Sequence, residues 1–262
     1  MLVVALALAF TAATACGRPS PPPQAPPSLP APPGTAQFPG QVIDLDDWYL
    51  TLPTGEEHNP DDVYQPELNT FTDRWFRLND KRDGVVFTAD AGGVTTKNTH
   101  YPRSELREMD GPAKAAWSNA TGTHTLRLRQ AVTQHPTVKP HVVTAQIHDG
   151  EADVIEVRLE GEHLLVEYDA GDGEITIDPE YVLGTPYDLE ITAAGGHIRV
   201  SYNGTQKADV VKSGSGWYFK TGSYVQSNPS RGDAPDAAGQ VVLYSLDVQH
   251  ARDPKAVDHH PW

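Results

Sequence analysis

The stretch Tyr101-Pro-Arg-Ser-Glu-Leu-Arg-Glu108 has the pattern of a β-strand with two different faces. Because side chains alternate along a strand, Arg103, Glu105 and Arg107 share one face. Leu106 lies on the opposite face, where it can enter a hydrophobic core. This alternation predicts one strand of a half-buried antiparallel sheet, with two guanidinium groups and a carboxylate on the face away from the core.

Two other stretches, Gln146-Ile-His148 and Tyr218-Phe-Lys-Thr-Gly-Ser-Tyr-Val-Gln226, show the same alternation. The polar residues of the longer stretch share one face, and they are Tyr218, Lys220, Tyr224 and Gln226. Apolar neighbours such as Phe219 point the other way and can join the core. Together the three stretches predict a curved sheet whose polar concave face forms a candidate active-site cleft.

Short strand-like runs separated by turn signals recur along the rest of the chain. They span 42–52, 84–88, 124–132, 142–148, 154–159, 163–168, 173–177, 187–192, 197–202, 205–211, 217–226 and 240–248. The pairs Gly161-Glu162, Gly195-Gly196 and Asn203-Gly204 suit tight hairpins. One short helix is predicted, at 66–71. The pattern predicts a single all-β domain, either a β-sandwich or a jelly roll.

The chain of 262 residues carries a formal net charge of -15. General nucleic-acid binders need basic surface that displaces counterions from phosphates, so this composition argues against nucleic acid as a partner. It is compatible with a polyanionic substrate held by a few local cations. Arg103, Arg107 and Lys220 form a candidate patch of this kind.

The N-terminal residues have the pattern of an export signal rather than of a transmembrane helix. Residues 2–16 form an apolar run too short to span a membrane, and small residues precede Cys16. Cys16 is the single cysteine, so the folded domain contains no internal disulfide. We predict a signal peptide at 1–16, possible lipoprotein processing with a lipid anchor at Cys16, a proline-rich linker at 17–40, a folded domain at 41–250 and a C-terminal tail at 251–262. We expect the mature protein to be a monomer that is either secreted or lipid-anchored at the bacterial cell surface.

Each polar segment, taken alone, has a structural interpretation. A carboxylate at Glu105 between Arg103 and Arg107 can form a surface charge ladder. A strand histidine such as His148 is more often a hydrogen-bonded structural residue, and tyrosines such as Tyr224 are common in strands because they pack well. Together, however, the segments supply a candidate base, a candidate acid and groups that bind carboxylates bidentately. This conjunction favours a catalytic site.

The three stretches resemble the motifs of the alginate lyases of polysaccharide lyase family 7. Those motifs read Arg-Ser/Thr-Glu-Leu/Val-Arg, Gln-Ile/Val-His and Tyr-Phe-Lys-Ala-Gly-x-Tyr-x-Gln, and this chain departs from them at Thr221, where the family usually has alanine. The stretch 42–55 also resembles the start of the family's domain. The resemblance therefore covers about 41–250, and it implies an all-β, jelly-roll β-sandwich of two antiparallel sheets whose concave face binds a polyuronate chain.

The resemblance also implies roles for the residues quoted above. The catalytic residues that it implies are His148, Tyr224, Gln146, Arg107 and Arg103. We assign the other polar residues of the motifs to substrate binding, namely Glu105, Lys220, Tyr218 and Gln226. Which of the two arginines is the principal carboxylate ligand stays open. No metal or other cofactor is implied, because arginine and amide groups take the place of the cation that other lyases use.

The implied reaction is β-elimination on alginate, and this chemistry accounts for the residue types. The proton at C5 of a uronate is weakly acidic because a second negative charge develops beside the carboxylate, so arginine and Gln146 must neutralise that carboxylate. Neutral His148 suits the base that removes the proton, and Tyr224 can protonate the oxygen that leaves C4. Isoleucine between Gln146 and His148 is associated in the family with activity on guluronate. We therefore expect an endolytic lyase that prefers guluronate-containing blocks and leaves 4,5-unsaturated uronate ends.

Other functions compete with this interpretation. A glycoside hydrolase needs two carboxylates flanking the scissile bond, but Glu105 and Glu108 lie on opposite faces of their strand. A non-catalytic carbohydrate-binding module would also display arginine, glutamine and tyrosine on a concave sheet, without needing His148 and Tyr224 at matched positions. Among lyases, the alternative substrate is another polyuronate such as glucuronan.

Overall fold

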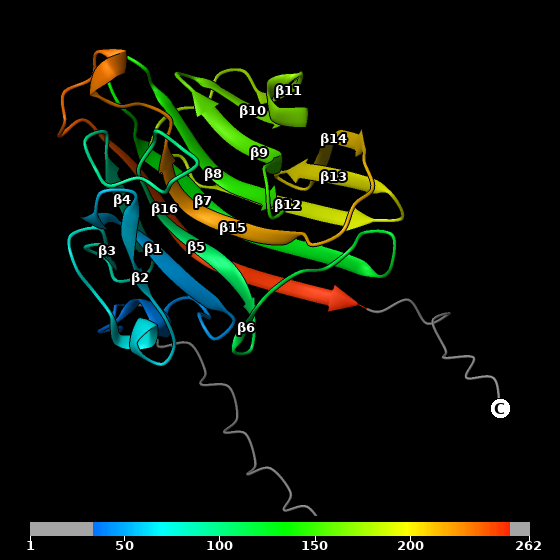
Figure 1. Cartoon of the computed structure of the whole chain (residues 1–262), viewed down its shortest axis with the longest axis horizontal. Coiled ribbons are helices and arrows are strands. Elements are labelled where there is room, and N and C mark those ends of the chain that lie inside the picture. Colours follow the sequence, from blue (N-terminus) through cyan, green and yellow to red (C-terminus); the bar gives the residue numbers. More distant parts are fainter. Residues whose placement is uncertain (1–33, 252–262) are drawn as a thin grey trace, which may run out of the picture.

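The computed structural model of the protein describes residues 34–251 (Figure 1). The predicted signal peptide, Cys16, the linker up to residue 33 and the tail from residue 252 lie outside the described residues. The last part of the predicted linker packs against the domain, because Ala36 and Pro39 are buried and Arg82 donates a hydrogen bond of 3.0 Å to the carbonyl of Ala36. No helix within 34–251 has the length and apolar character needed to cross a membrane.

Between residues 34 and 251 the strands form two antiparallel sheets, as predicted from the alternation and the resemblance. The nine-stranded sheet runs in the order β11-β10-β9-β8-β15-β5-β1-β2, with β6 paired to β5. Its strands are β1 (Trp48–Glu56), β2 (Asn59–Val63), β5 (Arg103–Asp110), β6 (Ala113–Lys114), β8 (His141–His148), β9 (Asp153–Glu160), β10 (His163–Tyr168), β11 (Gly173–Asp178) and β15 (Tyr218–Val225). Figure 1 shows this sheet curving over the second one.

In the same described range, the seven-stranded sheet runs in the order β14-β13-β12-β7-β16-β4-β3. Its strands are β3 (Phe76–Leu78), β4 (Val85–Asp90), β7 (Thr123–Gln134), β12 (Tyr187–Ala194), β13 (His197–Tyr202), β14 (Thr205–Val211) and β16 (Ala238–Ala251). Short 3-10 helices lie in the connections, and they are η1 (Pro39–Gln41), η2 (Glu67–Thr70), η3 (Asp169–Gly171) and η4 (Pro229–Arg231). Asn203 and Gly204 both have positive φ, as the tight turn between β13 and β14 requires.

Every strand-like run that the sequence predicts contains a strand, and the short helix predicted at 66–71 contains η2. The run at 42–52 becomes a strand only from Trp48. The sequence pattern misses β2, β3 and β6. β2 consists of Asn-Pro-Asp-Asp-Val, a composition typical of turns, and it is a strand because it pairs with β1 at the sheet edge.

The hydrophobic core lies between the two sheets. Leu106, Ile147 and Phe219, which come from the three strands with polar faces, are completely buried, as their alternation predicts. From the opposite sheet, the rings of Phe76 and Phe87 meet edge to face with their centroids 5.0 Å apart. Burying a side chain of this size stabilises the fold by about 2 kcal/mol. This packing fixes the orientation of the strands, and therefore of the residues on their other face.

The pairing of β15 with β8 contains a β-bulge beside the polar face. Between Thr221 and Tyr224, three steps along β15 lie opposite only two steps along β8. Gly222 lies within the bulge with a φ of 144°, and a Cβ atom there would lie 2.5 Å from the carbonyl oxygen of Ser104. Only glycine allows β15 to approach β5 so closely.

We expect Gly222→Ala to lower the free energy of unfolding by about 3 kcal/mol, because the added methyl group meets backbone atoms of β5. The control is Gly150→Ala, since a Cβ atom at Gly150 has no neighbour within 4 Å. Urea denaturation of both variants measures the difference. An unchanged midpoint for Gly222→Ala would show that β15 can move away from β5 without loss.

Candidate active site

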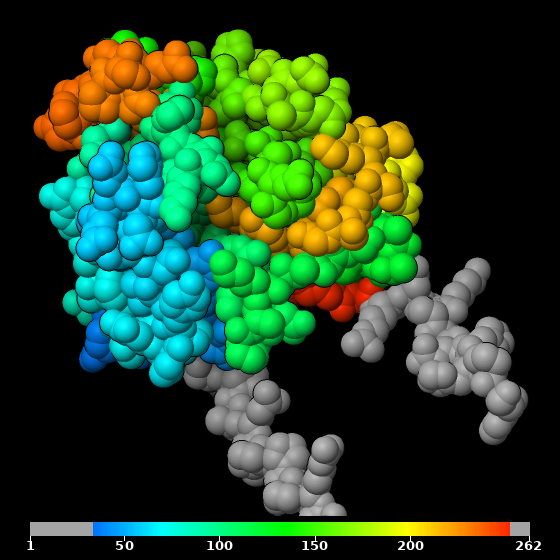
Figure 2. Space-filling model, in the orientation of Figure 1, coloured from blue at the N-terminus to red at the C-terminus, as the bar shows by residue number. Residues whose placement is uncertain are grey.

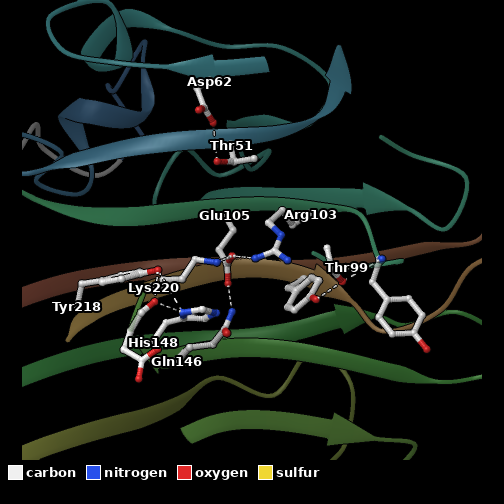
Figure 3. A network of polar contacts seen from close by, with 12 residues as sticks. Thr51, Asp62, Thr99, Arg103, Glu105, Gln146, His148, Tyr218 and Lys220 are labelled. Carbon is white, nitrogen blue, oxygen red and sulfur yellow. Dashed lines mark hydrogen bonds and ion pairs between the residues drawn. The ribbon is translucent and has the colours of Figure 1, made fainter. Parts of the chain in front are cut away.

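The three central strands of the nine-stranded sheet, β8, β15 and β5, bring the three sequence segments side by side. Residues far apart in the chain become cross-strand neighbours on the concave face. The pairs are Lys220 with Arg107 and with Gln146, Tyr224 with Arg103, and Tyr218 with His148. Figure 3 shows the labelled side chains from these strands converging in one network. The structure thus brings the residues of the predicted site together. Their polar side chains are largely buried, whereas the sequence pattern predicted a face exposed to solvent.

The carboxylate of Glu105 lies at the centre of this network and is 1% exposed. One of its oxygens accepts a hydrogen bond from the Gln146 amide, and the other contacts Lys220 Nζ and Arg103 Nη1, the latter at 3.0 Å (Figure 3). Burial alone raises the pKa of Glu105, but Lys220 and Arg103 outweigh it and lower the pKa below its ordinary value. Glu105 is therefore an ionised anchor that orients two cations and one amide.

Three cations form a row on the concave face, namely Arg103, Lys220 and Arg107. Lys220 is the middle one. Its side chain is buried, and this burial, together with the nearby Arg103, lowers the pKa of Lys220 to about 8. Glu105 opposes the shift only in part. Lys220 is therefore charged at neutral pH and loses its charge in mildly alkaline solution.

At one end of the row, Arg103 lies against Tyr224. The guanidinium carbon is 3.7 Å from the centroid of the ring, and the phenol oxygen lies 2.7 Å from Thr99 Oγ1. Burial raises the pKa of Tyr224 above its ordinary value, so the phenol keeps its proton at neutral pH. Within the described residues the buried Nε of Arg103 has no hydrogen-bond partner. This end offers a protonated phenol beside a guanidinium group with a free donor.

At the other end, Arg107 lies 3.7 Å from the centroid of the Tyr218 ring. Tyr218 donates a hydrogen bond of 2.9 Å to the carbonyl of Asp149, and the same carbonyl lies 2.5 Å from Nδ1 of His148. Nδ1 must carry the proton to bond this carbonyl, which leaves the lone pair of the neutral ring on Nε2. Burial, followed by the charge of Lys220, lowers the pKa of His148. His148 is therefore a neutral imidazole with a defined tautomer, and its Nε2 can accept a proton.

Gln226 lies one residue beyond the end of β15 and is largely buried. Its backbone N–H donates a hydrogen bond of 3.0 Å to the carbonyl of His141. Gln226 follows Tyr224 by two residues along the chain. Its role in substrate binding stays a prediction.

Comparison with known proteins agrees with this geometry. A family model described as alginate lyase matches residues 43–250. The chain belongs to the alginate lyases of polysaccharide lyase family 7. A comparison of this lyase with curated proteins finds no match.

Solved structures resemble this lyase over most of its length. The alginate lyase AlgAT5 of polysaccharide lyase family 7 is 47% identical with a TM-score of 0.79, over 82% of this chain and 100% of that one. The alginate lyase of Corynebacterium sp. is 44% identical with a TM-score of 0.78, over 82% of this chain and 98% of that one. A variant of the alginate lyase A1-II′ with a histidine and a tyrosine replaced, in complex with the substrate GGMG, is 29% identical with a TM-score of 0.72, over 86% of this chain and 100% of that one.

Sequence reasoning missed three residues that border the site of this lyase. Thr99 comes from the connection before β5, where no periodicity marks it. Tyr49 of β1 lies beneath Arg107, with 5.9 Å between the guanidinium carbon and the ring centroid. Glu156 of β9 lies opposite Gln146, and the alternation along β9 could have placed it on the concave face.

Carboxylates dominate the concave face on the side of β9, β10 and β11. Arg158 contacts Glu156 at 3.5 Å and Glu160 at 2.7 Å, and it also pairs with Glu167. Burial, and then the neighbouring charge of Asp153, raises the pKa of Glu156 to about 8. Beside the cationic row there is therefore a region that becomes more negative as the pH rises.

The raised pKa of Glu156 predicts that the protein loses stability as the pH rises. The unfolded chain releases this proton near pH 4.5, whereas the native protein keeps it up to a pH of about 8. The native state thus binds more protons between these values, so the free energy of unfolding falls as the pH increases. We expect wild type to lose about 3 kcal/mol relative to Glu156→Gln between pH 5 and pH 8.

Urea denaturation at several pH values measures this difference. Glu162→Gln removes the same charge from an exposed position and serves as the control. Parallel pH dependence of wild type and Glu156→Gln would contradict a protonated Glu156.

Proposed function

We propose that this alginate lyase cleaves alginate endolytically by β-elimination and prefers guluronate-containing blocks. The observation that carries the proposal is the arrangement of a neutral imidazole and a protonated phenol on one concave face, with a row of cations between them. The base is His148, the acid is Tyr224, and the row is formed by Arg103, Lys220 and Arg107. The unsaturated product follows directly from this division of roles.

The cations act on the carboxylate of the sugar that loses its C5 proton. That proton becomes acidic only when the negative charge developing on the adjacent carboxylate is stabilised, and preorganised cations and amides do this efficiently. Gln146 uses one N–H for Glu105 and keeps the second for the substrate. Glu105 has its oxygens occupied by Gln146, Lys220 and Arg103, so we assign it to orienting these groups rather than to touching the sugar.

Proton transfer uses the two ends of the row. His148 takes the C5 proton on Nε2, because Nδ1 is committed to the Asp149 carbonyl. Tyr224 gives its proton to the oxygen that leaves C4, and Thr99 holds the phenol at 2.7 Å. The electron pair of the C5–H bond forms the C4–C5 double bond as the C4–O bond breaks. The chain with the new double bond carries the unsaturated uronate.

The stereochemistry of the two uronates supports guluronate as the preferred unit. In guluronate the C5 proton and the C4 oxygen lie on opposite faces of the ring, so a base and an acid on two sides suit the reaction. In mannuronate they lie on the same face, where Tyr224 alone can perform both transfers if it starts as the phenolate, which takes the C5 proton and then gives it to the oxygen that leaves C4. His148 is therefore specifically required for guluronate under this proposal.

The shape of the face supports cleavage within a chain. Figure 2 shows a hollow between the blue and cyan part of the molecule and the green part that includes β9. Structures of variants of the neighbour A1-II′ hold a substrate written GGMG and a product written GGG. These complexes support an oligouronate as the ligand of the equivalent face here.

The test of this function is ultraviolet absorbance, because elimination creates a double bond conjugated to the carboxylate. We expect absorbance to rise on polyguluronate and more slowly on polymannuronate and glucuronan. His148→Ala should reduce kcat on polyguluronate by about 1,000-fold and on polymannuronate by much less, whereas Tyr224→Phe should abolish both. Equal losses for His148→Ala on the two polymers would refute the division of roles. No rise on any polymer would refute the lyase.

The pH dependence of kcat/KM tests the charge states. Because the pKa of His148 is lowered, the acidic limb should lie below pH 6.5. The alkaline limb should lie near pH 8, where Lys220 loses its charge, well before the phenol of Tyr224 ionises. Lys220→Arg keeps the charge to high pH, so its alkaline limb should move upward by about one pH unit or more. An alkaline limb that is the same in both proteins would exclude Lys220 as its origin.

A further inference from the structure

We propose that Lys139 and Arg231, gathered around the phenol of Tyr101, form a subsite for the carboxylate of a uronate unit that lies beyond the cleaved bond. This inference rests on the proposed function and extends it, because it names where the polyuronate chain continues after it passes Tyr224.

The two cations share a neutral partner instead of a carboxylate. Lys139 Nζ donates a hydrogen bond of 3.2 Å to the Tyr101 hydroxyl and lies 4.9 Å from the centre of its ring. Burial alone would raise the pKa of Tyr101, but the hydrogen bond from Lys139 and the neighbouring guanidinium group of Arg231 lower it. Across residues 34–251 neither cation forms an ion pair with a carboxylate, although many other arginines of this acidic chain do. Both charges are available to an anionic ligand.

The segments that carry these cations are held together before any ligand binds. The buried carboxylate of Asp233 accepts hydrogen bonds from the backbone N–H groups of Val138 and Lys139 at 2.8 and 2.9 Å, and from the Ser227 hydroxyl at 2.6 Å. It thereby joins the connection between β7 and β8 to the connection between β15 and β16. Cations fixed in this way lose little freedom when they bind a carboxylate.

The same segments reach the connection that precedes β5. The side chain of Asn228 donates a hydrogen bond of 3.0 Å to the carbonyl of His100, and Figure 2 shows the orange segment after β15 next to the green-cyan segment before β5. The backbone N–H of Tyr101 bonds Thr99 Oγ1 at 3.2 Å, and this oxygen lies 2.7 Å from the phenol of Tyr224. Tyr101, which Lys139 contacts, is therefore linked to the phenol of Tyr224 through two hydrogen bonds.

Charge also restricts the direction in which the substrate can run. Across the strands from Gln146, the residues in register are Glu156, then Glu167, then Glu174. Glu156 keeps its proton at neutral pH, so the negative charge of this row comes from Glu167 and Glu174, with Glu160 beside them. Arg158, which lies among them, is already paired. A polymer with one carboxylate on each sugar is repelled along that row. The favourable path follows the strands from Arg107 to Arg103, and it continues to Lys139 and Arg231.

The test compares oligoguluronates of increasing length in a Tyr224→Phe background, where binding is measured without cleavage. We expect Lys139→Gln/Arg231→Gln to weaken binding of a long oligomer about fivefold, and to weaken binding of a trisaccharide by less. The loss should shrink as salt is added. Lys81→Gln/Lys207→Gln removes the same two charges from exposed positions outside the concave face and should leave the affinity unchanged.

The outcomes separate this inference from the proposed function. Equal affinity of the Lys139→Gln/Arg231→Gln and background proteins for long oligomers, or an equal loss in the Lys81→Gln/Lys207→Gln control, would overturn the subsite. The wild-type absorbance assay tests the lyase independently, so turnover with an unaffected double variant refutes only the subsite. Absence of any oligoguluronate binding by the Tyr224→Phe protein would overturn the subsite, whereas absence of turnover by the wild type would refute the lyase. Circular dichroism of each variant confirms that the fold is retained.

Discussion

The buried carboxylate of Glu105 is the group on which the rest of the site depends. Arg103 and Lys220 lie close together in a region of low solvent exposure, where two uncompensated positive charges would repel each other and favour loss of a proton. A single ionised carboxylate beneath them offsets that repulsion and supplies hydrogen-bond acceptors for both and for Gln146. Removing one member of such a group leaves the others buried without compensation, which costs more than the isolated contact is worth. Glu105 therefore serves the chemistry without needing to contact the substrate.

This arrangement requires that β5, β8 and β15 keep a fixed register. A shift by one residue would turn each polar side chain into the core and each core side chain toward the sugar. The bulge at Gly222 shifts the pairing of β15 with β8 by one residue, since Lys220 lies opposite Gln146 and Tyr224 lies opposite Val143, but both side chains stay on the concave face. The apolar residues behind the strands hold this register, so packing in the core and charge on the concave face are two consequences of the same alternation.

The alternation explains why much of the fold and site could be predicted from the sequence. Strands with one buried face carry a period of two, and Leu106, Ile147 and Phe219 are buried as that period requires. The missing features depend on contacts that no local pattern records. β2 exists because β1 offers it an edge, and Thr99 reaches Tyr224 from an irregular connection. The burial of the polar face could not be predicted either. Periodicity gives the side of the strand on which Glu105 lies, but not how much of its surface neighbouring residues cover.

The negative net charge of the protein is compatible with a site that binds a polyanion through local cations. The formal net charge is -15, yet fields between exposed charges are screened over about 8 Å at physiological ionic strength, so a polyanion near the concave face responds mainly to local groups. Those groups are the row from Arg107 to Arg103, with Lys139 and Arg231 beyond it, and the carboxylates of β9 to β11 beside it. Attraction along the strands and repulsion across them together fix the orientation of a chain that carries a charge on every sugar. His148 and Tyr224 both lie on this concave face, so a chain held along the row passes the proposed base and the proposed acid.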